Sequence, residues 1–124
     1  STSAIPPQDM VRYRITAHQR DAKRRERMEA RRRVAWEIAQ RTAALLKVDY
    51  GASRVVLFGS LSRDEPFSSH SDIDLAVWGL DERVYYRVVS RLLDLDPSIS
   101  VDLLRAEALR DDLIHAIETT GMEL

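Results

Sequence analysis

The pattern of polar and apolar residues changes sharply near residue 48. From about Gln8 to Lys47 the chain has no Gly or Pro and is dense in Arg, Ala, Glu, Gln and Leu, which predicts one long helix or two joined helices. The first part of this segment carries too many charges to be buried. The second part has an apolar face that could dock on a core, formed by Val34, Trp36, Ile38, Leu45, Leu46 and several alanines. We expect the helix to pack only near its C-terminal end.

Beyond residue 48, short apolar runs alternate with segments of helical pattern. Three runs have the length and composition of strands: Arg54–Phe58, Ile73–Trp78 and Ile99–Leu104. Two helices are predicted between and after them, from the cap Asp81 through Leu95 and from Ala106 to Thr119. We therefore predict an α/β (α+β) fold, a small mixed β-sheet of at least three strands flanked by helices, with a long basic N-terminal helix.

Length and composition indicate a single folded unit. The 124 residues, of which 44% are hydrophobic, suffice for one core, so we expect no second, substrate-binding domain. The predicted division is an irregular N-terminus (1–9), a helical extension (10–47) and one domain (48–124). The chain has no cysteine, which excludes disulfides and thiolate metal sites, and no run of ~20 apolar residues, so a membrane span is not expected. The cytoplasm is the predicted location.

The net charge of −1 conceals a strong asymmetry along the chain. Residues 1–47 carry 12 Lys or Arg against 5 Asp or Glu, whereas residues 48–124 carry 7 against 15. The basic positions cluster in one stretch: Arg20, Lys23, Arg24, Arg25, Arg27, Arg31, Arg32 and Arg33. Such a stretch can follow a nucleic acid backbone, meet an acidic protein or remain solvated. No aromatic residues are interleaved to stack bases, so an acidic protein partner is favoured over nucleic acid.

Three aspartates are candidates for metal binding. Asp72 and Asp74 stand at the entry to the second predicted strand, where the two-residue period turns both carboxylates to the same face. Asp102 lies inside an otherwise apolar strand, where an ionised side chain needs a partner. If the third strand neighbours the second, the three carboxylates would form a set of hard oxygen ligands for divalent metal ions. Each alone has an ordinary alternative: the first two in turns or caps, and Asp102 in a pair with an arginine.

A candidate phosphate-binding turn follows the first predicted strand. Gly59 would let backbone N–H groups approach a phosphate closely, and the Ser60 hydroxyl could donate to one of its oxygens. We expect a short helical turn from Ser60 to Arg63, which would place the Arg63 guanidinium near the same phosphates. By itself, a Gly-Ser pair after a strand is more often plain turn chemistry.

The combined pattern resembles a known family. Gly59-Ser60, eleven further residues, Asp72-Ile73-Asp74 and, downstream, Val101-Asp102-Leu103-Leu104 are similar to the DNA polymerase β nucleotidyltransferase superfamily, and the small size to its minimal nucleotidyltransferases (MNT). The resemblance implies that Gly59 and Ser60 hold an NTP triphosphate and that Asp72, Asp74 and Asp102 are catalytic and bind two Mg²⁺ ions.

The resemblance also implies a biological role. Many MNT proteins are antitoxins that transfer AMP from ATP to a tyrosine of a HEPN ribonuclease toxin and so neutralise it. We therefore expect a cytoplasmic protein adenylyltransferase with a HEPN-type toxin as its partner. Two alternatives stay open: transfer of a nucleotide to a small molecule such as an aminoglycoside, and a non-catalytic module that blocks its partner sterically.

Overall fold

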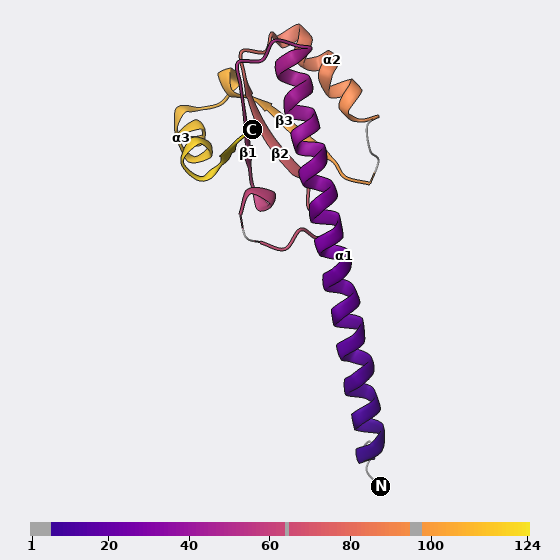
Figure 1. Cartoon of the computed structure of the whole chain (residues 1–124). Helices are drawn as coiled ribbons and strands as arrows, with labels where there is room; N and C mark the ends of the chain where they lie inside the picture. Colours follow the sequence, from indigo (N-terminus) through magenta and orange to yellow (C-terminus); the bar gives the residue numbers. More distant parts are fainter. Residues whose placement is uncertain (1–5, 64, 95–97) are drawn as a thin grey trace.

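The computed structural model describes residues 6–63, 65–94 and 98–124 as one long helix attached to a small sheet with further helices (Figure 1). The elements in chain order are α1 (Pro7–Val48), β1 (Arg54–Phe58), η1 (Ser60–Ser62, a 3₁₀ turn), β2 (Ile73–Trp78), α2 (Glu82–Leu92), β3 (Val101–Arg105), η2 (Ala106–Ala108, 3₁₀), α3 (Asp111–Thr120) and β4 (Met122–Glu123). The predicted fold class is confirmed.

The sheet is mixed, with the strand order β3-β2-β1-β4. Strand β1 pairs antiparallel with β2 on one side and with β4 on the other, whereas β2 and β3 are parallel. A parallel pair requires a crossover connection, which α2 supplies between β2 and β3. In this order β2 lies between β1 and β3. Because β2 and β3 are parallel, their N-terminal ends lie side by side at the same end of the sheet.

Helices cover both faces of the sheet. On one face, Leu57, Leu75 and Val77 pack with residues of α1 and α2 in the larger buried cluster. On the other face, Val56 and Ala76 pack against Ile117 of α3. The residues alternate between these two clusters along β1 and β2, as the two-residue period of a strand requires. Figure 1 shows α1 and α3 on opposite sides of the sheet.

The C-terminal part of α1 docks through small residues rather than through all the large ones that we expected. Its buried positions are Ala35, Ala39, Thr42, Ala43 and Leu46, which follow the three- and four-residue spacing of one helix face. Val34, predicted on the docking face, is instead 41% exposed. Alanines at the contact let the helix approach the sheet closely, and Val34 lies outside this buried face.

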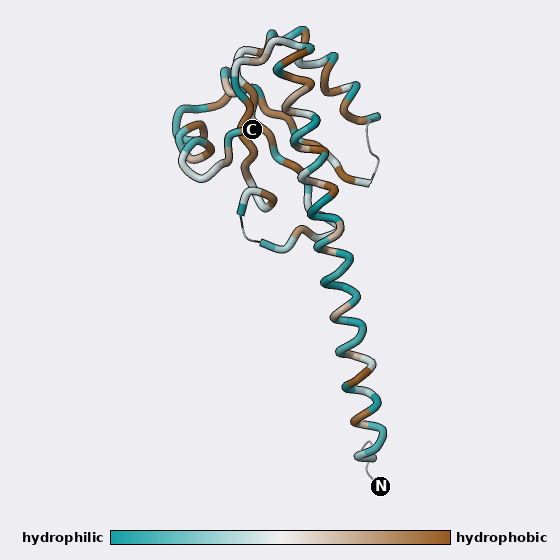
Figure 2. The backbone as a smooth tube through the Cα atoms, in the orientation of Figure 1, coloured by the Kyte–Doolittle hydropathy of each residue, from teal (hydrophilic) through white to brown (hydrophobic). Residues whose placement is uncertain are grey.

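The N-terminal part of α1 projects away from the domain as an isolated rod (Figure 1). Its surface is largely hydrophilic, with a few apolar positions among the polar ones (Figure 2). Val11, Tyr13 and Ile15 are each more than half exposed. We call residues 7–27 the arm. None of the described helices combines the length with the apolar character that crossing a membrane requires.

Several predicted boundaries differ from the structure. Helix α1 begins at Pro7, within the segment predicted to be irregular, because proline suits the first turn of a helix. Helix α2 ends at Leu92, and its predicted end at Leu95 lies outside the described residues. The last predicted helix is two elements, η2 and α3, since the chain is extended at Leu109 and Arg110. Strand β4 was not predicted.

Candidate functional site

The parallel register of β2 and β3 sets Asp74 directly opposite Asp102. Residues paired in this way point to the same face of the sheet, so the two side chains leave it together. Asp72 lies two residues before Asp74, where the chain enters β2. The third strand is therefore the neighbour of the second. This was the condition for the prediction that the three carboxylates form one set.

The charge of Asp74 is destabilised by its surroundings. Burial of this carboxyl raises its pKa above the usual value, and the negative charges of Asp102 and Asp72 raise it further. Arg63 acts in the opposite direction and lowers the pKa of Asp74. Asp72 and Asp102 thus lie close enough to repel the Asp74 carboxylate, and the Arg63 guanidinium lies close enough to offset part of that repulsion.

The chemistry of this donor set fits a divalent cation. Three carboxylates supply hard oxygen ligands of the kind that Mg²⁺ prefers, and a bound cation would relieve the repulsion that raises the pKa of Asp74. Within residues 6–63, 65–94 and 98–124, no three acidic or histidine side chains already stand in a metal-binding arrangement. Sharing an ion would therefore require rotations of these aspartate side chains, of which Asp72 and Asp102 are exposed.

Gly59 packs against Asp74 so closely that no side chain fits between them. Its backbone has φ 75° and ψ −159°, a combination that glycine alone adopts readily. A Cβ atom on Gly59 would collide with Oδ2 of Asp74 and lie 3.1 Å from its Cγ. The close approach follows from the antiparallel register, which sets Phe58 opposite Asp74. The turn and the carboxylates therefore form one continuous site.

The turn after Gly59 is shorter than the predicted helical turn. η1 spans only Ser60–Ser62, and Arg63 is already extended, so a helix dipole contributes little here. The Ser62 hydroxyl donates to the Gly59 carbonyl over 2.8 Å and holds the turn closed. In the described part of the chain, the half-buried Ser60 hydroxyl forms no hydrogen bond, which leaves it available to a ligand. The Arg63 side chain lies 3.4 Å from the Glu65 carboxylate.

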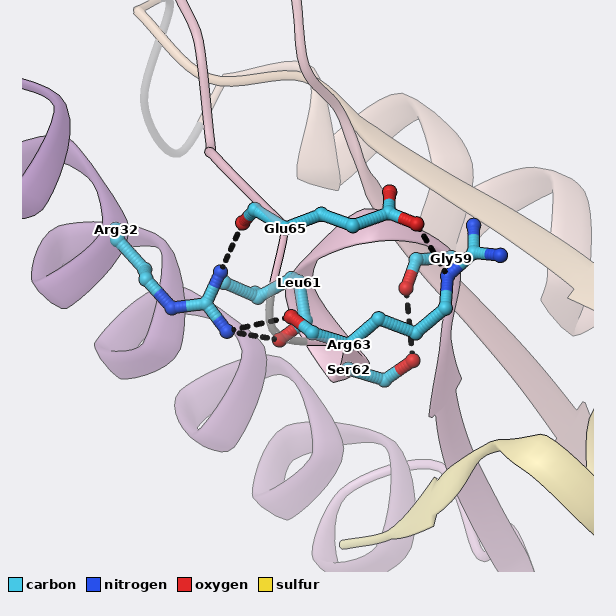
Figure 3. Close-up of polar contacts among 6 residues, drawn as sticks. All are labelled: Arg32, Gly59, Leu61, Ser62, Arg63 and Glu65. Carbon is cyan, nitrogen blue, oxygen red and sulfur yellow. Dashed lines mark hydrogen bonds and ion pairs between the residues drawn. The ribbon is translucent and has the colours of Figure 1, made fainter.

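Two arginines of the predicted basic stretch have a different role from the one their charge indicated. Arg31 and Arg32 donate to backbone carbonyls of the segment between β1 and β2, so they are not free to follow a nucleic acid backbone. Figure 3 shows Arg32 reaching from α1 to this segment. These contacts could not be predicted from the sequence, because no local spacing distinguishes an arginine that binds the carbonyls of a distant loop from a solvated one.

Comparison with protein families identifies the family of the chain. The family model described as polymerase beta, nucleotidyltransferase matches residues 40–124, which include all six predicted site residues. No curated protein sequence matches the chain. The family resemblance predicted from the sequence is thus confirmed over the segment from the docked end of α1 to β4.

Solved structures of toxin–antitoxin systems share the fold. A toxin–antitoxin with AMP-PNP is 25% identical with a TM-score of 0.55, and the match covers 67% of this chain and 69% of that chain. A mutant of the toxin–antitoxin MntA-HpeT is 27% identical with a TM-score of 0.54, covering 68% and 69%. The tri-AMPylated Shewanella oneidensis HEPN toxin in complex with MNT antitoxin is 22% identical with a TM-score of 0.53, covering 72% and 70%, and bears on the fold alone.

Proposed function

The chain belongs to the polymerase β nucleotidyltransferase family, and we propose that it transfers AMP from ATP to a tyrosine of a HEPN-type toxin, which it thereby neutralises. One observation carries the chemical part of this proposal. The register of β2 and β3 sets Asp74 opposite Asp102 and beside the turn that begins at Gly59, and Asp72 directly precedes β2. The partner is supported by structural relatives that are toxin–antitoxin systems, one of them solved with AMP-PNP.

The proposed roles follow from the chemistry of each residue. The backbone of the turn that begins at Gly59 and the free Ser60 hydroxyl receive the triphosphate, and the Arg63 guanidinium neutralises part of its charge. Asp72, Asp74 and Asp102 would hold two Mg²⁺ ions, which when bound neutralise the phosphate oxygens and the leaving group. The aspartates would bind these ions as ionised carboxylates.

The reaction itself needs little covalent chemistry from the protein. The tyrosine oxygen attacks the α-phosphorus in line with the bond to the β-phosphate, the new P–O bond forms, and pyrophosphate leaves. Asp102, exposed at the start of β3, accepts the proton of the tyrosine hydroxyl. Most of the rate enhancement would come from holding the reactants in place and from charge neutralisation.

The test is transfer of AMP to an intact partner. The purified chain is incubated with ATP, Mg²⁺ and the protein encoded by the neighbouring gene, as the candidate HEPN-type partner, and the mass of the intact partner is recorded. We expect a gain of one or more AMP units with the wild type and none with Asp72→Asn. A partner of unchanged mass that is nevertheless inhibited by both proteins would instead establish the steric module, and AMP on an added aminoglycoside would establish the small-molecule enzyme.

The arm of α1 carries a basic face that would fit an acidic surface on the partner. Arg20, Lys23, Arg24 and Arg27 occupy positions i, i+3, i+4 and i+7 and therefore share one face of the helix. In the part of the chain that the structure describes, none of the four forms an ion pair. We propose that this face, rather than the dispersed charges around it, approaches the toxin, while binding of nucleic acid is the less favoured alternative.

Charge reversal on that face tests the proposal. The double substitution Arg20→Glu and Arg24→Glu is expected to weaken association with the toxin at least about 10-fold at low salt, because two attractions become repulsions. The matched control is Arg14→Glu with Arg25→Glu, which changes the net charge equally on another side of the helix. Titration calorimetry measures both. Equal losses would mean that only net charge matters, and retention of RNA by the wild type but not by the first variant would favour nucleic acid.

The ion pair between Arg63 and Glu65 predicts opposite effects of two substitutions on nucleotide affinity. Both side chains are at least half exposed, so the pair is weak, and a triphosphate would displace the carboxylate from the guanidinium. Arg63→Ala should raise the Kd for ATP about 5- to 20-fold, whereas Glu65→Gln should leave it unchanged or lower it about 2-fold. A fluorescent ATP analogue measures both constants. A loss of affinity in Glu65→Gln would show that Glu65 supports binding.

A further inference from the structure

The guanidinium of Arg32 on helix α1 donates hydrogen bonds to three carbonyl groups of the segment between β1 and β2. Arg32 donates through Nη1 to the carbonyl oxygen of Glu65 at 2.8 Å. Through Nη2 it donates to the carbonyl oxygens of Leu61 at 3.0 Å and of Arg63 at 2.9 Å. Figure 3 shows these oxygens converging on the guanidinium, with the Arg63 side chain directed away from Arg32. The contacts join positions separated by about 30 residues in sequence.

The preceding residue anchors the next part of the same segment. Arg31 donates to the carbonyl oxygens of Ser68 at 2.9 Å and Ser69 at 3.4 Å. Its guanidinium also lies over the ring of Phe67, 5.6 Å from the centroid, and that ring is almost fully buried. Arg31 therefore fastens the part of the segment that leads to Asp72, while Arg32 fastens the part that begins at Gly59.

The geometry of Arg32 bears on the turn that would receive the triphosphate. Convergence of three carbonyl oxygens is electrostatically unfavourable unless a cation with several donors lies among them, and the guanidinium is planar with five N–H groups. The turn is thus fixed twice at Leu61, by its fully buried side chain and by the bond from Arg32 to its carbonyl. With the carbonyl of Arg63 held toward α1, its side chain extends on the other side, away from Arg32 (Figure 3).

We propose that Arg32 is a positioning residue of the nucleotide site, which holds the Gly59–Arg63 turn in the conformation that receives the triphosphate. It does not touch the nucleotide, and it acts through the backbone of Leu61 and Arg63. The inference rests on the proposed function for its substrate. As a consequence, the conformation of the nucleotide-binding turn depends on the docking of α1 on the domain.

Three variants distinguish the effect of the planar Arg32 guanidinium from the effect of its charge and from a general loss of folding. Arg32→Ala removes the donors and the charge, and Arg32→Lys keeps the charge but replaces the planar fork by a single ammonium group. Arg33→Ala is the matched control, because Arg33 is the next residue on α1, is exposed and forms no hydrogen bond or ion pair among the described residues. Circular dichroism first establishes that all three fold.

ATP binding, AMP transfer and amide hydrogen exchange are then measured on the full chain. For Arg32→Ala we expect a 5- to 20-fold rise in the Kd and KM for ATP, a change in kcat below about 3-fold, and faster exchange at residues 60–63. Arg32→Lys should recover only part of the affinity, and Arg33→Ala should match the wild type. Wild-type affinity and exchange in Arg32→Ala, or equal changes in Arg33→Ala, would overturn the inference.

The readouts also separate this inference from the proposed function. If the wild type binds ATP but transfers no AMP to the toxin, the proposed acceptor is wrong, while the binding constants still decide the role of Arg32. If the wild type does not bind ATP, the nucleotide site is wrong and the inference falls with it, whatever the exchange rates are. If AMP transfer is normal in both the wild type and Arg32→Ala, with equal KM, only the inference fails.

Discussion

Replacing Asp74 by Asn is expected to abolish AMP transfer and, at the same time, to make the metal-free protein more stable. The substitution removes a ligand from the carboxylate set, which should lower kcat/KM at least about 10²-fold. It also removes a half-buried negative charge that burial, Asp102 and Asp72 all disfavour. We expect Tm of the metal-free protein to rise by about 2 to 4 °C.

The pH dependence of this stabilisation has a definite sign. Since the pKa of Asp74 is raised above 3.8 in the folded state, folding takes up a proton in the window above that value. The contribution of Asp74 to stability is therefore fully present below pH 3.8 and is lost as the pH rises through the pKa of Asp74 in the folded state. The Tm advantage of Asp74→Asn should be small in acid and grow toward neutral pH.

Thermal unfolding of metal-free protein across pH measures this effect, with Asp72→Asn as the matched variant. Asp72 is exposed, so its substitution should cost activity with a smaller gain in Tm. Mg²⁺ with ATP should raise the Tm of the wild type and leave that of Asp74→Asn nearly unchanged. If, without metal, Asp74→Asn had a lower Tm than the wild type, the negative charge of Asp74 would not be unfavourable in the folded protein.

Gly59→Ala is expected to damage both the fold and the site. The φ of 75° and ψ of −159° disfavour any side chain, and the new Cβ would collide with the Asp74 carboxylate. We expect a loss of about 2 to 4 kcal/mol in the free energy of unfolding and AMP transfer below about 1% of the wild-type rate. Both losses arise because Asp74 or the turn must move to admit the methyl group.

Gly51→Ala provides the control for backbone strain alone. Gly51 also has a positive φ, of 73°, but a Cβ there would meet nothing within 4 Å. Its substitution should cost about 1 kcal/mol and leave kcat/KM within about 2-fold of the wild type. Urea unfolding and AMP transfer are measured on both variants. Equal losses of activity in the two would show that Gly59 matters only for stability.

The shared face of Asp72 and Asp74 stays a prediction from local spacing. It rests on the alternation of side chains along a strand, whereas β2 begins at Ile73, directly after Asp72. The position of Asp102 depended on the order of the strands, which a pattern of short apolar runs leaves open. The resemblance to a family supplied what the spacing alone could not.

Other features could not be predicted because they depend on packing between distant segments. Strand β4 has only two residues, and its pairing with β1 makes it a strand, not its own composition. The docked face of α1 uses alanines such as Ala35 and Ala39, which a search for large apolar residues overlooks. Arg32 has the composition of a solvated helix position and is distinguished only by the carbonyls that surround it.

Transfer of AMP to the partner is tested by labelling the two ends of ATP separately. The chain, Mg²⁺ and the purified HEPN partner are incubated with ATP labelled at the α-phosphate and, in parallel, with ATP labelled at the γ-phosphate. We predict that the α-label becomes attached to a tyrosine of the partner while the γ-label is released in pyrophosphate, and that Asp74→Asn abolishes both. Attachment of the γ-label, or no attachment of the α-label by a chain that binds ATP, would show that the protein does not transfer AMP to this partner.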